Sequence, residues 1–146
     1  MFDRRKGVRG NRPIQQFDAS IHHAGGRAQV ISLNPLVGEA RYSGVIGNDT
    51  FAFLRAEVLR KTQSAKSLVL DMTRILSTST VVPPIPIGTY PTNSAPAVVI
   101  CRPDQIQGWT EYSQNAAATG VVRIVFLESE RVQAVSVAMT LAGVVP

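Results

Sequence analysis

The sequence predicts an α/β domain built on a mixed, mostly parallel β-sheet. Three apolar runs of strand length, residues 67–75, 97–101 and 121–127, alternate with segments whose apolar residues recur at helical spacing. Strands that alternate with helices form parallel sheets with right-handed crossovers. Residues 27–33 and 39–46 also have strand character and are joined by a short connection. We therefore expect these two strands to pair antiparallel at the N-terminal edge of the sheet.

The predicted central strand covers residues 67–75. Residues 68–70 (LVL) form a continuous apolar run, which is typical of a strand buried on both faces. The run ends at Asp71. In open α/β sheets, ligands and partners bind beyond the carboxyl ends of the parallel strands. We therefore expect residues 71–80 to lie at the functional edge.

Composition is typical of a single globular domain. The chain has 146 residues, of which 45% are hydrophobic and 17% charged, and these values do not fit a disordered chain. No apolar run reaches the ~18 residues of a membrane span, and the charged N-terminus does not resemble a signal peptide. The single cysteine, Cys101, excludes an internal disulfide. These features favour a cytoplasmic protein.

Positive charge is concentrated in residues 1–26, which we interpret as a flexible arm preceding a single domain at 27–146. The first 27 residues hold six basic and two acidic side chains, whereas the other 119 hold nine and eight. Such an arm attracts nucleic acid or an acidic partner, or it is a solvated tail. The nucleic-acid candidates are Arg4, Arg5, Lys6, Arg9 and Arg12.

Helical spacing of apolar residues recurs in three segments, residues 48–64, 102–120 and 129–142. We expect Asn48 or Asp49 to cap the first helix and Ser129 to cap the last. The expected inward-facing residues are Phe51, Leu54 and Val58, then Ile106, Trp109 and Tyr112 or Ser113, and finally Val132, Val135 and Ala138 or Met139.

A proline-rich segment follows the central strand. Five of the nine prolines lie between residues 83 and 96, so a continuous helix across 82–96 is excluded. A long structureless loop inside a compact domain either counts against this assignment of elements or is a functional loop. Its Pro83–Pro86 stretch has the PxxP spacing of polyproline ligands, a weak pattern by itself.

Three segments of the chain resemble the STAS domain, the family of anti-sigma-factor antagonists and sulfate-transporter tails. Residues 42–50 (YSGVIGNDT) are similar to the second strand and first helix of that family. Residues 67–73 (SLVLDMT) are similar to its apolar strand ending in Asp-Leu-Ser. Residues 122–131 (VRIVFLESER) are similar to its last strand and helix. The resemblance covers about residues 28–143.

The resemblance implies a regulatory module that docks a protein partner, without catalysis. In the antagonists, a serine at the start of the second helix is phosphorylated, and the added charge disfavours docking. The corresponding candidates here are Ser79 and Thr80. The family pattern Asp-Ser-Ser-Gly is not conserved in residues 77–80 (STST), and prolines follow it. These hydroxyls could instead bond to nearby backbone.

Six residues form the predicted partner or ligand edge: Asp71, Thr73, Ser77, Tyr90, Cys101 and Arg102. Cys101 would lie before a helix N-terminus and beside Arg102, two features that lower a thiol pKa. A redox or covalent role is thus one interpretation of Cys101, and a buried structural cysteine is the other.

The sequence contains no catalytic or metal-binding motif of high specificity. His22 and His23 point apart on regular structure and have no third ligand nearby, and Asp71 has no second acid or histidine placed to form a pair. We therefore expect a non-enzymatic protein without cofactor or metal. It would dock a protein, bind a small ligand such as a lipid or anionic metabolite, or associate with nucleic acid.

Overall fold

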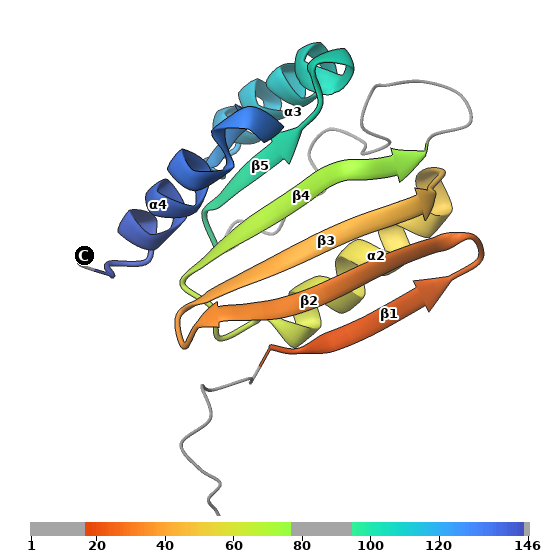
Figure 1. Cartoon of the computed structure of the whole chain (residues 1–146), viewed down its shortest axis with the longest axis horizontal. Coiled ribbons are helices and arrows are strands. Elements are labelled where there is room, and N and C mark those ends of the chain that lie inside the picture. Colours follow the sequence, from red (N-terminus) through yellow and green to blue (C-terminus); the bar gives the residue numbers. More distant parts are fainter. Residues whose placement is uncertain (1–16, 77–94, 145–146) are drawn as a thin grey trace, which may run out of the picture.

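The computed structural model describes residues 17–76 and 95–144 and contains one six-stranded sheet (Figure 1). Strand order follows the sequence: β1 (Ala19–His23), β2 (Gly26–Asn34), β3 (Val37–Val45), β4 (Ser67–Leu76), β5 (Ala97–Cys101) and β6 (Arg123–Leu127). The first three strands are antiparallel neighbours, and β3 to β6 are parallel. The predicted mixed, mostly parallel α/β sheet is confirmed.

Helices cover both faces of the sheet. The helices are α2 (Asn48–Lys61), α3 (Ile106–Ala118), which continues a 3₁₀ turn at Pro103–Gln105, and α4 (Arg131–Leu141), which continues a 3₁₀ turn at Glu128–Glu130. Figure 1 shows α4 in front of the sheet and α2 behind it. Residues of α2 and α3 share one hydrophobic core, and those of α4 belong to the other.

β4 contributes alternately to the two cores. Leu68 and Leu70 pack in the core of α2 and α3, whereas Val69 packs in the core of α4. Successive side chains of a strand point to opposite faces, so a strand between two helical layers must be apolar throughout. The predicted burial of this strand on both faces is therefore confirmed.

The folded domain begins before residue 27, so the expected arm boundary at residue 26 is wrong. β1 pairs with β2 in register from Ala19↔Val30 to His23↔Gly26. Phe17 is buried, and its N–H donates to Ser32 Oγ at 3.0 Å. A turn at Ala24 and Gly25 closes this hairpin, with Ala24 at φ 53°. The sequence suggested a glycine-interrupted arm because β1 has little apolar alternation, and the arm arginines at positions 4–12 lie outside the described residues.

Two helix starts also differ from expectation. Gly47, and not Asn48 or Asp49, is the N-cap of α2, although Asp49 lies in the first turn and suits the helix dipole. Ser129 lies in the 3₁₀ turn before α4 instead of capping it. Val132, expected to face inward, is 86% exposed, whereas Val135 and Ala138 of the same expected face pack on the core.

Candidate functional site

β4 contains a β-bulge at the place where the functional edge was expected to begin. Asp71 pairs with Arg41, but the next pair is Arg74 with Ser43, so β4 has one extra residue between them. Asp71 therefore lies inside the strand, which continues to Leu76, and not at its end. Bulges redirect the side chains that follow them. Here the bulge turns Arg74 onto the face that carries α4.

Predicted edge residues hold this bulge. The Asp71 carboxylate accepts hydrogen bonds from the Thr73 N–H at 2.9 Å and from the Thr73 hydroxyl at 2.7 Å. Arg102 donates from Nη1 to the Thr73 carbonyl at 2.6 Å, and Gln105 Nε2 donates to the Met72 carbonyl at 3.1 Å. The structure thus brings Asp71, Thr73 and Arg102 together, and their contacts organise the backbone at the end of β4.

A charge network joins α4 to the sheet beside the bulge. Glu39 on β3 is fully buried and lies 2.6 Å from Arg131 Nη2 and 3.2 Å from Arg41 Nε. Arg131 also lies 3.5 Å from Asp71. The hydrogen bond to Glu39 raises the pKa of Arg131, which keeps the guanidinium charged. Sequence reasoning missed this network because its members are up to 92 residues apart and only the tertiary fold brings them together.

Cys101 is buried at the end of β5, and its pKa is raised to about 11. Burial is the main cause, and Asp104 adds to it, while Arg102 lowers the pKa by less. Arg102 acts in the expected direction, but the expected net lowering of the pKa is wrong, because desolvation of the thiolate outweighs the effect of Arg102. These properties support the structural interpretation of Cys101.

We expect Cys101 to resist alkylation by iodoacetamide at pH 8. The thiolate is the nucleophile, and a rise of the pKa from 9.0 to about 11 reduces its fraction. Labelling followed by mass spectrometry should be at least about a hundredfold slower in the native protein than in urea. Rapid labelling of the native protein would contradict the structural assignment and restore the redox interpretation.

Exposed apolar side chains gather at the carboxyl end of the parallel strands. Val45 and Leu76 pair across β3 and β4 and are 45% and 64% exposed. The exposed Phe53, in the first half of α2, stacks on His23 with ring centroids 4.2 Å apart. Val132 follows β6 at the same end. Four of the seven large, exposed hydrophobic residues in the described ranges thus lie here, and we call them the apolar edge.

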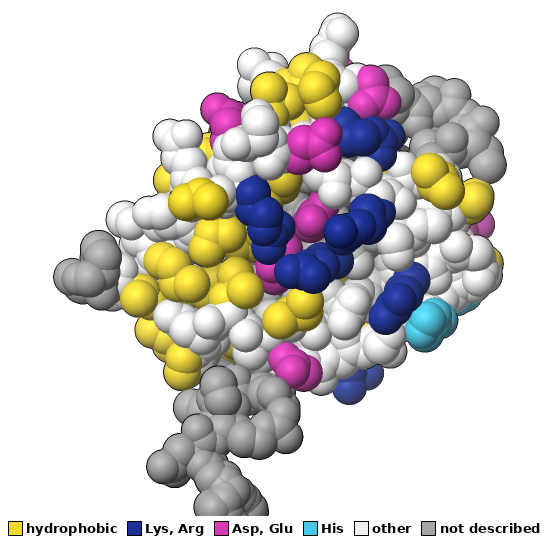
Figure 2. All heavy atoms as spheres, in the orientation of Figure 1, with side chains coloured by type: hydrophobic (Ala, Val, Ile, Leu, Met, Phe, Trp, Pro, Cys, Tyr) yellow, Lys and Arg dark blue, Asp and Glu magenta, His cyan; other side chains and the backbone are white. Residues whose placement is uncertain are grey.

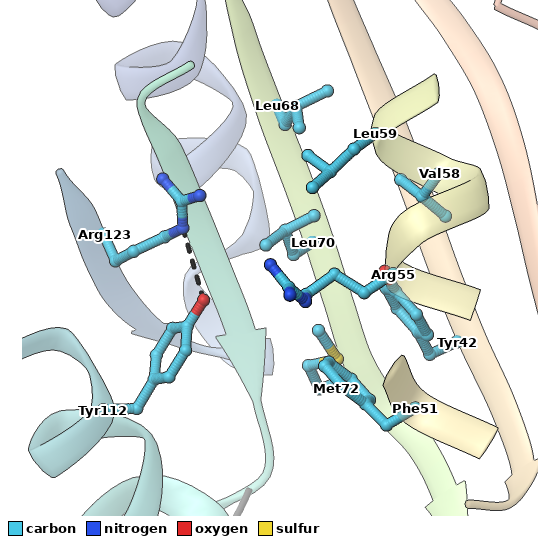
Figure 3. A pocket seen from close by; sticks show the side chains of 10 residues that line it. All are labelled: Tyr42, Phe51, Arg55, Val58, Leu59, Leu68, Leu70, Met72, Tyr112 and Arg123. Carbon is cyan, nitrogen blue, oxygen red and sulfur yellow. Dashed lines mark hydrogen bonds between the residues drawn. The ribbon is translucent and has the colours of Figure 1, made fainter. Parts of the chain in front are cut away.

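A second feature is the groove between α2 and α3 on the opposite face (Figure 3). Arg55 of α2 and Arg123 of β6 border it, above Leu70 and Met72 of β4. The enclosed volume is about 20 Å³, which holds about one water molecule. As it stands, this groove is packed core with no room for a metabolite.

Arg123 links one side of the groove to neighbouring chain segments. Arg123 donates to the Tyr112 hydroxyl at 3.3 Å and to the Ala95 and Val122 carbonyls at 2.8 and 2.7 Å. Burial is the main cause of the raised pKa of Tyr42, which therefore stays neutral. Trp109, expected to face inward, is a core residue that meets Tyr112 edge-on.

Other predicted site residues cannot be placed in this geometry. Ser77, Ser79, Thr80 and Tyr90 lie outside the described residues. His22 and His23 lie on β1, where His22 contacts Ser20 Oγ at 3.3 Å. No group of three or more metal-binding side chains occurs within residues 17–76 and 95–144. None of the α-helices in those ranges has the length and apolar character needed to cross a bilayer.

Comparisons of the chain with protein-family models, curated proteins and solved structures found no match. The STAS-like interpretation therefore continues to depend on the three sequence segments that suggested it.

Proposed function

We propose that this chain is a non-enzymatic regulatory module of STAS-like type that docks a protein partner through the apolar edge. The observation that carries the proposal is that Val45 and Leu76 pair side by side and are exposed at the carboxyl end of the sheet, with the exposed Phe53 and Val132 at the same end on α2 and α4. Exposed apolar clusters bordered by polar groups are typical of protein–protein contacts.

Charged residues and a firmly held backbone surround this edge. Arg74 is exposed next to Leu76, and Arg102 pairs with Asp104 at 3.0 Å at the end of β5. The β4 bulge between Asp71 and Arg74 is held by side-chain hydrogen bonds. An apolar centre with a charged rim on a preorganised frame supports specific docking, because little ordering is needed on binding.

Phosphorylation of Ser79 or Thr80 would switch off docking at the apolar edge. Ser79 and Thr80 follow Leu76 by three and four residues in the sequence. A phosphate so close in the chain to the apolar edge would oppose docking by charge and by the cost of desolvation. Acidic substitution of both residues should then weaken partner binding, whereas unchanged binding would exclude the switch while leaving the docking proposal intact.

The substitution Leu76→Asp tests the docking proposal. A charge in the centre of the contact should weaken capture of the partner from host lysate by about tenfold or more, the loss typical of an interface hot spot. The matched control is Leu36→Asp, because Leu36 is also exposed but lies in the turn between β2 and β3, at the opposite end of the sheet. Capture should be compared by quantitative mass spectrometry, with thermal melting as a check of folding.

Equal capture by both variants and the parent protein would overturn the proposal. Nuclease treatment and a variant lacking residues 1–16 distinguish protein docking at the apolar edge from nucleic-acid binding by the arm. Truncation must stop there, because Phe17 and β1 belong to the fold. Loss of all captured material with either treatment would favour the nucleic-acid alternative.

A further inference from the structure

An arginine-lined hollow lies over β2, β3 and the end of β4, on the face of the sheet that also carries α4. Its lining residues are Arg27, Gln29, Arg41, Ser43 and Arg74, and its volume is about 310 Å³. Figure 2 shows basic side chains gathered around acidic ones on this face. We propose that this hollow, the arginine basin, binds a compact phosphate monoester. The inference does not require docking at the apolar edge, although Arg74 borders both features.

Sheet register explains how the arginines converge. Arg27, Ser43 and Arg74 lie in one row across β2, β3 and β4, and Gln29 and Arg41 form the adjacent row. Strands are ~4.8 Å apart, so Arg27 and Arg74 start about 10 Å apart on either side of a small serine. Two long side chains can close this distance onto a shared anion.

The bulge in β4 is required for this row. In an unbulged strand, residue 73 would pair with Ser43, and Arg74 would point toward α2. The hydrogen bonds from Thr73 to Asp71 and from Arg102 to the Thr73 carbonyl hold the bulge in place. Asp71 and Thr73 are thus positioning residues for Arg74.

Charge in the basin is not balanced by the protein. Within the described residues, the side chains of Arg27 and Arg74 form no hydrogen bond or ion pair, and Arg41 shares Glu39 with Arg131. Asp71 is already bonded to Thr73 and Arg131. Four arginines therefore face two carboxylates that are already engaged. A bound anion would relieve the repulsion between like charges on neighbouring strands.

Size and lining fit a phosphate monoester. Guanidinium groups bind phosphate oxygens in pairs, and Ser43 and Gln29 offer a hydroxyl and an amide as further donors. The volume is at the lower end of the range for small-ligand sites, ~300–1,000 Å³. A polar lining disfavours a lipid tail, so the anionic metabolite of the sequence analysis has a better site here than in the groove of Figure 3.

Calorimetric titration of the full chain with O-phosphoserine tests the proposal, with serine and sulfate as ligand controls. Binding should be saturable, and Arg27→Gln or Arg74→Gln should each weaken it at least about tenfold, the loss expected for one charge-assisted contact. Arg60→Gln is the matched control, because Arg60 pairs with Glu57 on α2, on the other face of the sheet. This variant should bind within about twofold of the parent, since distant surface charges are screened.

Three outcomes would overturn the proposal. The first is the absence of saturable binding up to about 10 mM, a concentration beyond the usual range of specific ligands. The second is an equal loss in Arg60→Gln and the two basin variants. The third is binding of an oligonucleotide without binding of the monoester, which would assign the basin to nucleic acid. Melting curves of the three variants confirm that each is folded.

Discussion

Replacement of Gly44 by alanine should lower the free energy of unfolding by about 3 kcal/mol. Gly44 has φ +90°, a conformation that L-residues adopt at a cost of ~1–2 kcal/mol. Its added Cβ would overlap the carbonyl oxygen of Gly25, which belongs to the β1–β2 turn. Overpacking against backbone adds ~1–3 kcal/mol, because this carbonyl also accepts a hydrogen bond from the Val45 N–H at 3.2 Å. Urea denaturation followed by circular dichroism measures the loss.

Substitutions at two other glycines separate the conformational cost in Gly44→Ala from the cost of the steric overlap. Gly120 has φ +83° but open space around its Cβ position, so Gly120→Ala should show the conformational cost alone, about 1 kcal/mol. Gly47 has open space and an extended backbone, so Gly47→Ala should show neither cost and should lose less than about 1 kcal/mol, from its N-cap position alone. If Gly44→Ala and Gly120→Ala were equally destabilising, contact with the β1–β2 turn would have no energetic role.

Glu39→Gln should lower the free energy of unfolding by about 2 kcal/mol. The substitution keeps the shape of the side chain but removes the charge that pairs with Arg131 and Arg41. Breaking a fully buried pair costs ~3–5 kcal/mol. We expect less, because each arginine side chain is more than a third exposed and keeps part of its hydration. The loss should be measured by urea denaturation at neutral pH.

Glu57→Gln is the matched control for charge removal. Glu57 also lies 2.6 Å from an arginine, Arg60, but this pair is on the surface of α2. Exposed ion pairs contribute little to stability, so the free energy of unfolding of the control should be close to that of the parent protein. A double-mutant cycle of Glu39→Gln with Arg131→Gln then isolates the contact between the sheet and α4. Additive effects would show that this pair does not stabilise the docking of α4.

Local patterns in the sequence predicted much of the fold. The apolar runs at β4 and β5 indicated buried parallel strands, and Phe51, Leu54 and Val58 indicated the inner face of α2. These predictions succeeded because side-chain direction in a strand or helix repeats with a fixed period. β1 was missed because a strand with little apolar alternation is held by its neighbour and its turn more than by its own pattern.

The sequence by itself therefore determined the α/β class, the antiparallel start of the sheet and the sides on which α2 and α3 are apolar. Only the tertiary structure decided the bulge, the burial of Glu39 against Arg131, and the placing of Arg27, Arg41 and Arg74 around one hollow. Periodicity along the chain determines which side chains share a face. One extra residue in β4 reverses that assignment, and charges pair through space with partners that no local pattern contains.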